Sequence, residues 1–332
     1  MYMDYGNHNP GYGNAAKEKT TSDLTCYLYS KQPVLMDRNV LNIENVHQCN
    51  CCMGYKTLHP LVSVIDLSKA GLERHTVKFD FYTVLLIEGG VDDFFFGRKS
   101  YDYSNASLRF LIPGETVKID NDGAIPRKGW LLAFHPDLIC HTALGKNLKN
   151  YSFLFYNPDE SLHLSLREKE KAVSCLHCIE EELRHAIDCH SKILISRYIE
   201  LFLDYCSRFY ERQFITQCDA NKAFIDHADR LLDEYIRTGK LKSGLFPSNE
   251  YFAGILRLSP YYFRDLLKFE TGKSLNEYIE SKRLDAAKRM LSVRENTVSM
   301  VAERLGYPSA RYFSRLFKKL TGTAPNEYRR IN

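Results

Sequence analysis

A repeat in the C-terminal quarter of the chain constrains the fold more than any other feature of the sequence. At an offset of 50 residues, segment 259–272 recurs as segment 309–322, and segment 276–278 recurs as segment 326–328. Ten positions are identical: Ser259/Ser309, Tyr262/Tyr312, Phe263/Phe313, Leu266/Leu316, Lys268/Lys318, Thr271/Thr321, Gly272/Gly322, Asn276/Asn326, Glu277/Glu327 and Tyr278/Tyr328. Such self-similarity indicates one supersecondary unit that is present twice.

Each copy is predicted to be a helix-turn-helix unit. In the first copy, residues 250–272, the leading helix is Tyr251–Leu256. Ser259 caps the second helix and Pro260 takes its first position, which together are a strong start signal. Gly272 then ends that helix, because glycine tolerates the left-handed conformation found after helix C-termini.

The second copy, residues 297–322, follows the same plan with a turn that is one residue longer. Val298–Arg304 is the predicted leading helix, and Ser309–Leu320 is the second. The small residues Ala253 and Ala302 stand where the two helices of each unit are expected to cross closely.

The second helix of each copy has an apolar and a polar face. The apolar positions are Phe263, Leu266 and Leu267 in one copy and Phe313, Leu316, Phe317 and Leu320 in the other. The outward positions, with their neighbours Tyr262, Tyr312 and Lys319, form the predicted DNA-binding set: Tyr261, Arg264, Asp265 and Lys268, then Arg311, Ser314, Arg315 and Lys318. One such helix would more simply be a solvated basic face, but two copies favour insertion into the major groove.

A long helix is predicted between the two units, at Leu275–Leu291. Ser274 and Glu277 form a capping box at its start. Seventeen helical residues extend about 25 Å, so this helix can hold the two reading helices roughly one DNA turn, about 34 Å, apart. A single chain could then read two successive major grooves of double-stranded DNA.

The charge distribution agrees with a nucleic-acid partner. Residues 220–332 contain 21 Lys and Arg against 13 Asp and Glu, a net charge of +8. The rest of the chain contains 24 against 28, a net charge of −4. A basic C-terminal part joined to a mildly acidic part indicates that the C-terminal part meets a polyanion.

Residues 224–330 resemble the AraC/XylS-type regulator domain, and three segments carry the resemblance: 302–307 (AERLGY), 312–319 (YFSRLFKK) and 323–330 (TAPNEYRR). The resemblance implies that Tyr261, Arg264 and Asp265 in the first copy approach bases, as do Arg311, Ser314 and Arg315 in the second. Asp265 stands where the second copy has Arg315. Because a carboxylate repels phosphate but accepts from the cytosine amino group, the first helix is expected to read bases differently or to insert less deeply.

The N-terminal part is predicted to be rich in strands from about Val34 to Tyr156, with short apolar runs separated by turn signals. These runs are His75–Leu85, Phe94–Phe96, Ser107–Ile112, Glu115–Ile119, Gly129–Phe134 and Tyr151–Tyr156. Many short strands imply a sandwich or small barrel. Members of the resembled family carry a cupin-like sandwich at this place, and residues 82–156 look similar to one.

Helical periodicity replaces the strand pattern near Arg167. Two amphipathic helices follow, and they pack either on the sheet or on a second copy of the chain. The predicted class is α+β, a cupin-like β sandwich or barrel with a helical pair, then an all-α double helix-turn-helix domain. The expected parts are a disordered lead-in (1–25), a sensory domain (26–166), a dimerising helical pair (167–212), a linker (213–223) and the DNA-binding domain (224–332).

No metal, cofactor or catalytic site is predicted. His135 and His141 lack the spacing of a metal-binding cupin. The cysteines of segments 49–52 and 175–178 have no second ligand pair at finger spacing. No nucleophile comes with a base and an orienting group. Ten cysteines without a signal or membrane segment indicate free thiols in a reducing cytoplasm.

The sequence therefore predicts a cytoplasmic, sequence-specific transcription regulator of the AraC type that is not an enzyme. It is expected to be a homodimer that is controlled at its N-terminal domain by a small-molecule effector or by a partner, with RNA polymerase as a further partner if it is an activator. Two alternatives stay open. A cupin-type enzyme with an attached DNA module would need a metal triad, and a non-specific architectural DNA-binding protein would show no preferred site. The effector, the operator and the sign of regulation are not specified by the sequence.

Overall fold

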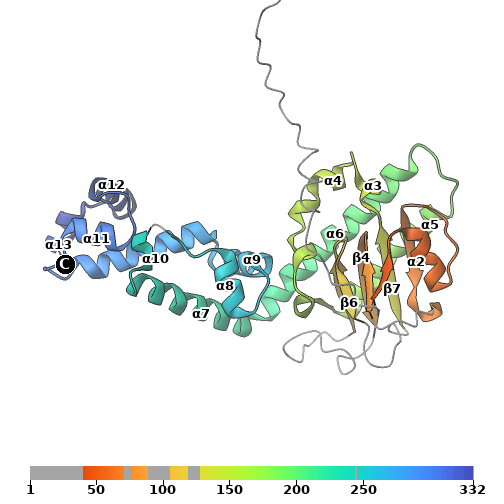
Figure 1. The fold of residues 1–332 in the computed structure, drawn as a ribbon, viewed down its shortest axis with the longest axis horizontal. Coiled ribbons are helices and arrows are strands. Elements are labelled where there is room, and N and C mark those ends of the chain that lie inside the picture. The colour runs from red at the N-terminus through yellow and green to blue at the C-terminus, as the bar shows by residue number, and fades with distance from the viewer. Residues whose placement is uncertain (1–39, 71–75, 89–104, 119–127, 244, 332) are drawn as a thin grey trace, which may run out of the picture. The chain divides into compact units, whose positions relative to one another are not determined.

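The computed structural model describes residues 40–70, 76–88, 105–118, 128–243 and 245–331, which belong to one unit spanning residues 39–332. Two β-sheets with helices lie in the N-terminal part, and residues after 165 are helical (Figure 1). This arrangement confirms the mixed α+β class. Every helix among the described residues is too short or too polar to span a lipid bilayer.

Eight strands form two open sheets within the described part of the chain. The antiparallel sheet has the order β2-β7-β4-β5-β8, and the smaller sheet has the order β1-β3-β6 with β1 parallel to β3. The strands are β1 (Val40–Ile43), β2 (Val62–Asp66), β3 (Thr76–Phe79), β4 (Tyr82–Glu88), β5 (Ala106–Leu111), β6 (Thr116–Lys118), β7 (Gly129–Phe134) and β8 (Leu162–Leu164). Neither sheet closes on itself, so the expected cupin-like barrel is not confirmed.

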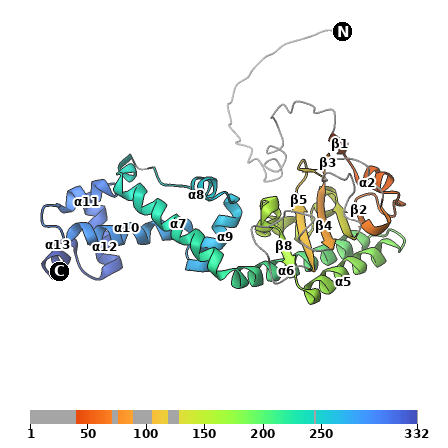
Figure 2. The same ribbon diagram turned by 90° about the horizontal axis from the view of Figure 1, so that it is seen from below.

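The five-stranded sheet is buried on both faces. Because successive side chains of a strand point to opposite faces, Val84 and Leu86 of β4 join one apolar cluster and Leu85 joins another. The first cluster includes α5 (Leu166–Leu183) and α6 (Ser191–Thr216), which lie side by side along the sheet (Figure 2). The second cluster includes the smaller sheet and α2 (Val46–Met53).

Short helices lie within and directly after the region that was expected to be rich in strands. They are α2, α3 (Pro136–Ile139), α4 (Ala143–Asn147) and the 3₁₀ helices η1 (Leu67–Lys69), η2 (Leu148–Asn150), η3 (Ser152–Phe155) and η4 (Pro158–Glu160). The expected strand Tyr151–Tyr156 is therefore wrong, because β8 pairs with β5 and the segment closes local turns instead. The run Phe94–Phe96 lies outside the described residues.

The apolar stripes of α5 and α6 face the sheet. Leu176 and Ile179 of α5 and Ile199 and Phe202 of α6 are buried in the same cluster as the strands. The helical pair was expected to pack either on the sheet or on a second copy of the chain, and its apolar stripes pack on the sheet. Any contact with a second copy has to use the other faces of the helices.

The segment 213–223, expected to be a linker, is helical apart from Gln217. Helix α6 ends at Thr216 and α7 (Cys218–Arg237) begins two residues later. Buried Asn221 donates to the backbone oxygen of Phe214 at 2.8 Å, which bridges the break. The two parts of the chain are thus joined by nearly continuous helix.

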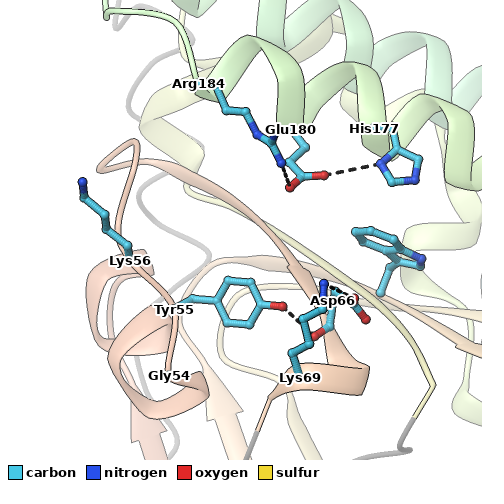
Figure 3. Close-up of a pocket in the computed structure, with 9 residues that line it drawn as sticks. Gly54, Tyr55, Lys56, Asp66, Lys69, His177, Glu180 and Arg184 are labelled. Carbon is cyan, nitrogen blue, oxygen red and sulfur yellow. Dashed lines mark hydrogen bonds and ion pairs between the residues drawn. The ribbon is translucent and has the colours of Figure 1, made fainter.

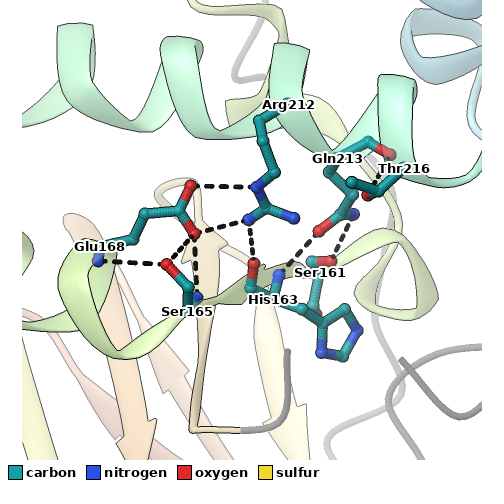
Figure 4. A network of polar contacts seen from close by, with 7 residues as sticks. All are labelled: Ser161, His163, Ser165, Glu168, Arg212, Gln213 and Thr216. Carbon is teal, nitrogen blue, oxygen red and sulfur yellow. Dashed lines mark hydrogen bonds and ion pairs between the residues drawn. The ribbon is translucent and has the colours of Figure 1, made fainter. Parts of the chain in front are cut away.

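Figure 4 shows the polar network that fixes the end of α6 to β8 and to the start of α5. The Arg212 guanidinium contacts both carboxylate oxygens of Glu168, at 3.0 and 2.8 Å, and donates to the backbone oxygen of His163 at 2.6 Å. Gln213 accepts from the backbone nitrogen of His163 at 2.8 Å and donates to the backbone oxygen of Ser161 at 3.2 Å. Both side chains thus hold strand β8 against the helix.

The C-terminal part contains α7, the 3₁₀ helix η5 (Lys240–Ser243), α8 (Asn249–Leu256), α9 (Pro260–Thr271), α10 (Leu275–Leu291), α11 (Val298–Arg304), α12 (Ala310–Thr321) and α13 (Pro325–Ile331). These helices share a third apolar cluster. In both views, α8 and α9 lie near one end of α10, and α11, α12 and α13 lie near its other end.

We predict that Arg212→Ala lowers the free energy of unfolding by about 1–3 kcal/mol, because it leaves the largely buried Glu168 carboxylate without its cation. The control is Arg237→Ala, since Arg237 pairs with Glu234 and both side chains are largely exposed. The control should cost less than about 1 kcal/mol. Guanidinium chloride unfolding measures both, and equal losses would contradict the role given to Arg212.

Candidate DNA interface

The first helix-turn-helix unit consists of α8 and α9. The Ser259 hydroxyl accepts from the backbone nitrogen of Tyr262 at 3.1 Å, which caps α9, and Pro260 follows at the first helical position. Ala253 is buried where α8 meets α9. Gly272 ends α9 with a φ of 68°. The start and stop signals in the sequence thus predicted this unit correctly.

The second unit, α11 and α12, repeats this geometry with one added residue. The Ser309 hydroxyl caps α12 by accepting from the backbone nitrogen of Tyr312 at 3.1 Å. Each turn contains a backbone hydrogen bond of 2.9 Å to the small residue at the helix crossing. The backbone nitrogen of Leu258 donates to the backbone oxygen of Ala253, and that of Tyr307 donates to Ala302. Ser259 follows Leu258 directly, whereas Pro308 separates Tyr307 from Ser309, so Pro308 is the residue by which the second turn is longer.

Helix α12 presents its polar face to solvent. Phe313 and Phe317 are buried in the C-terminal core. The exposed side chains are Arg311, Tyr312, Arg315, Lys318 and Lys319, whereas Ser314 is half-buried with its hydroxyl bonded to the Ala310 backbone oxygen at 2.7 Å. Leu320, expected on the buried side, is 48% exposed because the core contacts of α12 end at Phe317.

Helix α9 places Tyr261, Arg264 and Lys268 at its surface. The Arg264 guanidinium lies 5.2 Å from the Tyr261 ring centroid, and its Nε contacts Asp265 at 2.9 Å. Tyr262 is only 6% exposed, and its ring packs against Tyr156 and Phe214. Burial therefore leaves little of the Tyr262 side chain exposed for the DNA contact that the sequence predicts.

Two outward residues of α9 contact the 3₁₀ helix η3 and its neighbour Tyr156. The Asp265 carboxylate accepts hydrogen bonds from the hydroxyls of Ser152 and Tyr156, the latter at 2.8 Å. The Tyr261 ring stacks on Phe155 with the centroids 4.8 Å apart. Burial and the neighbouring Asp265 carboxylate raise the pKa of Tyr156 well above its usual value, so its hydroxyl remains a donor. No local pattern in the sequence predicted this contact.

Helix α10 has the predicted bounds, and its Ser274–Glu277 capping box is present. A buried Arg283 fixes it to the second unit. Its Nε donates to the backbone oxygen of Leu305 at 2.9 Å, and its guanidinium lies 3.7 Å from the Tyr307 ring centroid. Glu280 pairs with Arg283 at 2.7 Å and accepts from the Tyr307 hydroxyl at 2.7 Å.

Sequence reasoning missed this network. Arg283 follows Ile279 by four residues, so the only signal was a charged residue on the apolar stripe of α10. The network matters for the interface because it ties the turn that precedes α12 to the helix between the two units.

A second candidate site is a polar pocket of about 480 Å³ on the N-terminal part. It lies between the end of α2, β2 and η1, β7 and α5 (Figure 3). Its lining is Gly54, Tyr55, Lys56, Asp66, Lys69, Trp130, His177, Glu180 and Arg184. The pocket thus combines aromatic walls with charged groups of both signs.

The charged groups of the pocket pair with one another. Glu180 contacts Arg184 at 2.8 Å and His177 at 3.3 Å. Across the pocket, Asp66 pairs with Lys69 at 3.2 Å. The imidazole of His177 meets the Trp130 ring edge-on at a centroid distance of 4.8 Å. A ligand here would have to exchange partners with these pairs.

The described cysteines that the sequence singled out lie on helices α2 and α5. Cys49 is buried on α2, and burial raises the pKa of its thiol to about 12. Cys175 and Cys178 lie on α5, where Cys175 packs in the core. In the parts of the chain that the structure describes, no three His, Cys, Asp or Glu side chains are grouped so that they could hold a metal ion.

Comparisons with known proteins find matches for the C-terminal helices. The helix-turn-helix domain family matches residues 252–331. The chain is 36% identical over 121 residues to an uncharacterised HTH-type transcriptional regulator of Bacillus subtilis, YobQ, covering 32% of this chain and 50% of that protein. It is 25% identical over 276 residues to the HTH-type transcriptional activator RhaR of Mannheimia succiniciproducens, covering 78% and 86%.

Among solved structures, the C-terminal domain of AraT, a response regulator from Geobacillus stearothermophilus, is 35% identical, covers 31% of this chain and 84% of that chain, and gives a TM-score of 0.26. The chain spans half or less of the length of the first curated relatives it matches. The two curated relatives described above are regulators by name, in agreement with the expectation of a protein that is not an enzyme.

We predict that Gly306→Ala destabilises the second unit more than Gly322→Ala does. Both glycines have positive φ, 73° and 81°, so alanine costs about 1–2 kcal/mol at either position. A Cβ at Gly306 would also lie 2.2 Å from the Leu241 backbone oxygen, whereas a Cβ at Gly322 meets nothing within 4 Å. The added clash should cost a further 1–3 kcal/mol or so. Thermal unfolding tests this, and equal losses would contradict the close approach.

Proposed function

We propose that the chain, whose residues 252–331 match a helix-turn-helix domain family, is a sequence-specific DNA-binding transcription regulator of the AraC type. The observation that carries this proposal is the polar face of α12, where Arg311, Arg315 and Lys318 are exposed around a helix anchored by Phe313 and Phe317. Such a helix fits the major groove, in which arginine can bind a guanine edge bidentately.

The two units are proposed to read successive major grooves through α9 and α12. Helix α10 supports this geometry, because its seventeen residues extend about 25 Å between the units. The base readers are Tyr261, Arg264 and Asp265 on α9 and Arg311, Ser314 and Arg315 on α12. Lys268, Lys318, Lys319 and Tyr312 are proposed to contact the DNA backbone.

We infer that residues 26–166, for which the sequence predicts a cupin-like sensory domain, bind a small molecule in the polar pocket. Residues 177, 180 and 184, on and directly after α5, complete the lining of that pocket. Three basic residues against two carboxylates, beside Trp130 and Tyr55, favour a small polar ligand with an anionic group and a flat face. Trp130 is the only tryptophan of the chain, so its fluorescence reports directly on the pocket. An effector that alters DNA binding but leaves this fluorescence unchanged would bind elsewhere.

The remaining assignments complete the proposal. The chain acts as a homodimer through residues 167–212, where Ile193, Leu194 and Leu201 of α6 are exposed apolar side chains. Activation would make RNA polymerase a further partner. The similarity to an activator by name supports that sign of regulation.

Selection of bound duplexes from random DNA tests the proposed function. The full chain should enrich one motif, and its affinity for that motif should fall steeply with salt because phosphate contacts release counterions. Recovery of random sequences would favour a non-specific architectural protein instead.

We predict that Arg315→Ala lowers discrimination at one half of the selected site, whereas Lys318→Ala weakens all sequences alike. A bidentate arginine–guanine contact is worth roughly 1–3 kcal/mol of discrimination. Lys318 lies one turn nearer the C-terminus of α12, where a phosphate is the nearer partner, so its loss should also reduce the salt slope by about one unit.

Competition binding against the selected site and its single-base variants separates these roles, with each substituted chain serving as the control for the other. If Arg315→Ala keeps the wild-type ranking of the variants, the assignment of Arg315 as a base reader is wrong.

A further inference from the structure

Residues 152–160 of the N-terminal part contact one side of the polar face of α9 and its first turn, and we propose that this contact holds the first helix-turn-helix unit off DNA until it is released. The inference rests on the proposed function, since it assigns a regulation to the same reading helix. We call residues 152–160 the docking segment; it consists of η3, η4 and the two residues between them.

At the first turn of α9, the docking segment supplies a carboxylate. Glu160 is only 7% exposed, and its two oxygens accept from the backbone nitrogen of Ser259 at 2.6 Å and from the Ser259 hydroxyl at 2.5 Å. The N-terminus of a helix attracts anions because its backbone N–H groups are free and the helix dipole is positive there. On DNA, phosphate oxygens take such positions. Glu160 thus occupies a place that suits a phosphate.

Along the side of α9, the docking segment contacts two of the residues that are proposed to read bases, Tyr261 and Asp265. The hydroxyls of Ser152 and Tyr156 satisfy the Asp265 carboxylate, and the Phe155 ring covers one face of Tyr261. A major groove about 12 Å wide admits one helix. It has no room for α9 together with a second chain segment on the reading face.

The second unit shows what the same positions look like without a docking segment. Arg311 and Arg315 stand fifty residues after Tyr261 and Asp265, and both are exposed on α12. The acidic Asp265, which departs from the second copy and would repel phosphate, finds its hydroxyl donors on the docking segment. Two of the outward positions at which the copies differ, 261/311 and 265/315, are therefore the ones that contact the N-terminal part in the first copy.

Docking and insertion of α9 into DNA exclude each other, because they use the same atoms of Ser259, Tyr261 and Asp265. The full chain then binds DNA mainly through α12. Its apparent affinity for a site that spans two grooves is the intrinsic affinity multiplied by the fraction of molecules in which the docking segment is released. Release of the docking segment adds the second groove.

The test uses the full chain with the substitutions Ser152→Ala, Phe155→Ala and Tyr156→Phe, which remove the side contacts without touching α9. The matched control is Tyr151→Phe, because the Tyr151 hydroxyl donates to Asp204 on α6, at 2.7 Å, and not to α9. The probe is random duplex DNA, selected separately with the wild type, the release variant and the control.

The release variant should recover a second sequence block about one helical turn, ~10 base pairs, from the first. It should bind that longer site at least tenfold more tightly than the wild type and the control do. Arg264→Ala should cost the release variant at least fivefold more affinity than it costs the wild type, whereas Arg315→Ala should weaken both equally. Glu160→Gln, which keeps the side-chain volume, should shift affinity in the same direction and guards against a folding defect in the triple variant.

The outcomes separate the two claims. If no chain enriches a motif, the proposed function fails and this inference fails with it. If the wild type already recovers both blocks with the affinity of the release variant, and Arg264→Ala weakens both chains alike, the proposed function stands and the docking proposal is overturned.

Discussion

The contact between the Glu160 carboxylate and the first turn of α9 is the interaction on which the arrangement of the described chain depends. A buried carboxylate is costly unless its oxygens are hydrogen-bonded, and Ser259 with the backbone nitrogen of Asn157 supplies those bonds. The backbone oxygen of Glu160 accepts from the Tyr210 hydroxyl on α6 at 3.1 Å. One residue therefore connects the reading helix, the docking segment and the helix that leads into the C-terminal part.

The internal repeat builds one scaffold with two surfaces. The serine caps, terminal glycines and buried phenylalanines are shared, because the folding of each unit needs them. Apart from Lys268 and Lys318, the outward positions differ, so that α9 carries groups that bind the N-terminal part and α12 carries groups that suit DNA. Helix α5 also contributes to two places. His177 and Glu180, with Arg184 directly after the helix, line the polar pocket, while Glu168 near its start binds Arg212. A ligand in the pocket would thus contact the element that anchors α6.

The sequence predicted the C-terminal helices closely because their signals are local: caps, a proline, glycines and apolar positions three or four residues apart. It predicted less where partners are distant in the chain. Burial of Tyr262 depends on Tyr156, and Glu160 meets Ser259 across 99 residues. The apolar run 151–156 suggested a strand, yet β8 already takes the neighbouring sheet edge. The linker expected at 213–223 is helical because Gln213 and Asn221 are buried and hydrogen-bonded there.

Hydrogen exchange of the full chain, with and without a duplex that contains both half-sites, tests the central claim that α9 is shared between the N-terminal part and DNA. The account predicts that DNA protects the amides of α12 and keeps those of α9 protected, while amides of residues 152–160 exchange faster because the docking segment is displaced. Unchanged protection of residues 152–160 in a complex that protects both reading helices would contradict it.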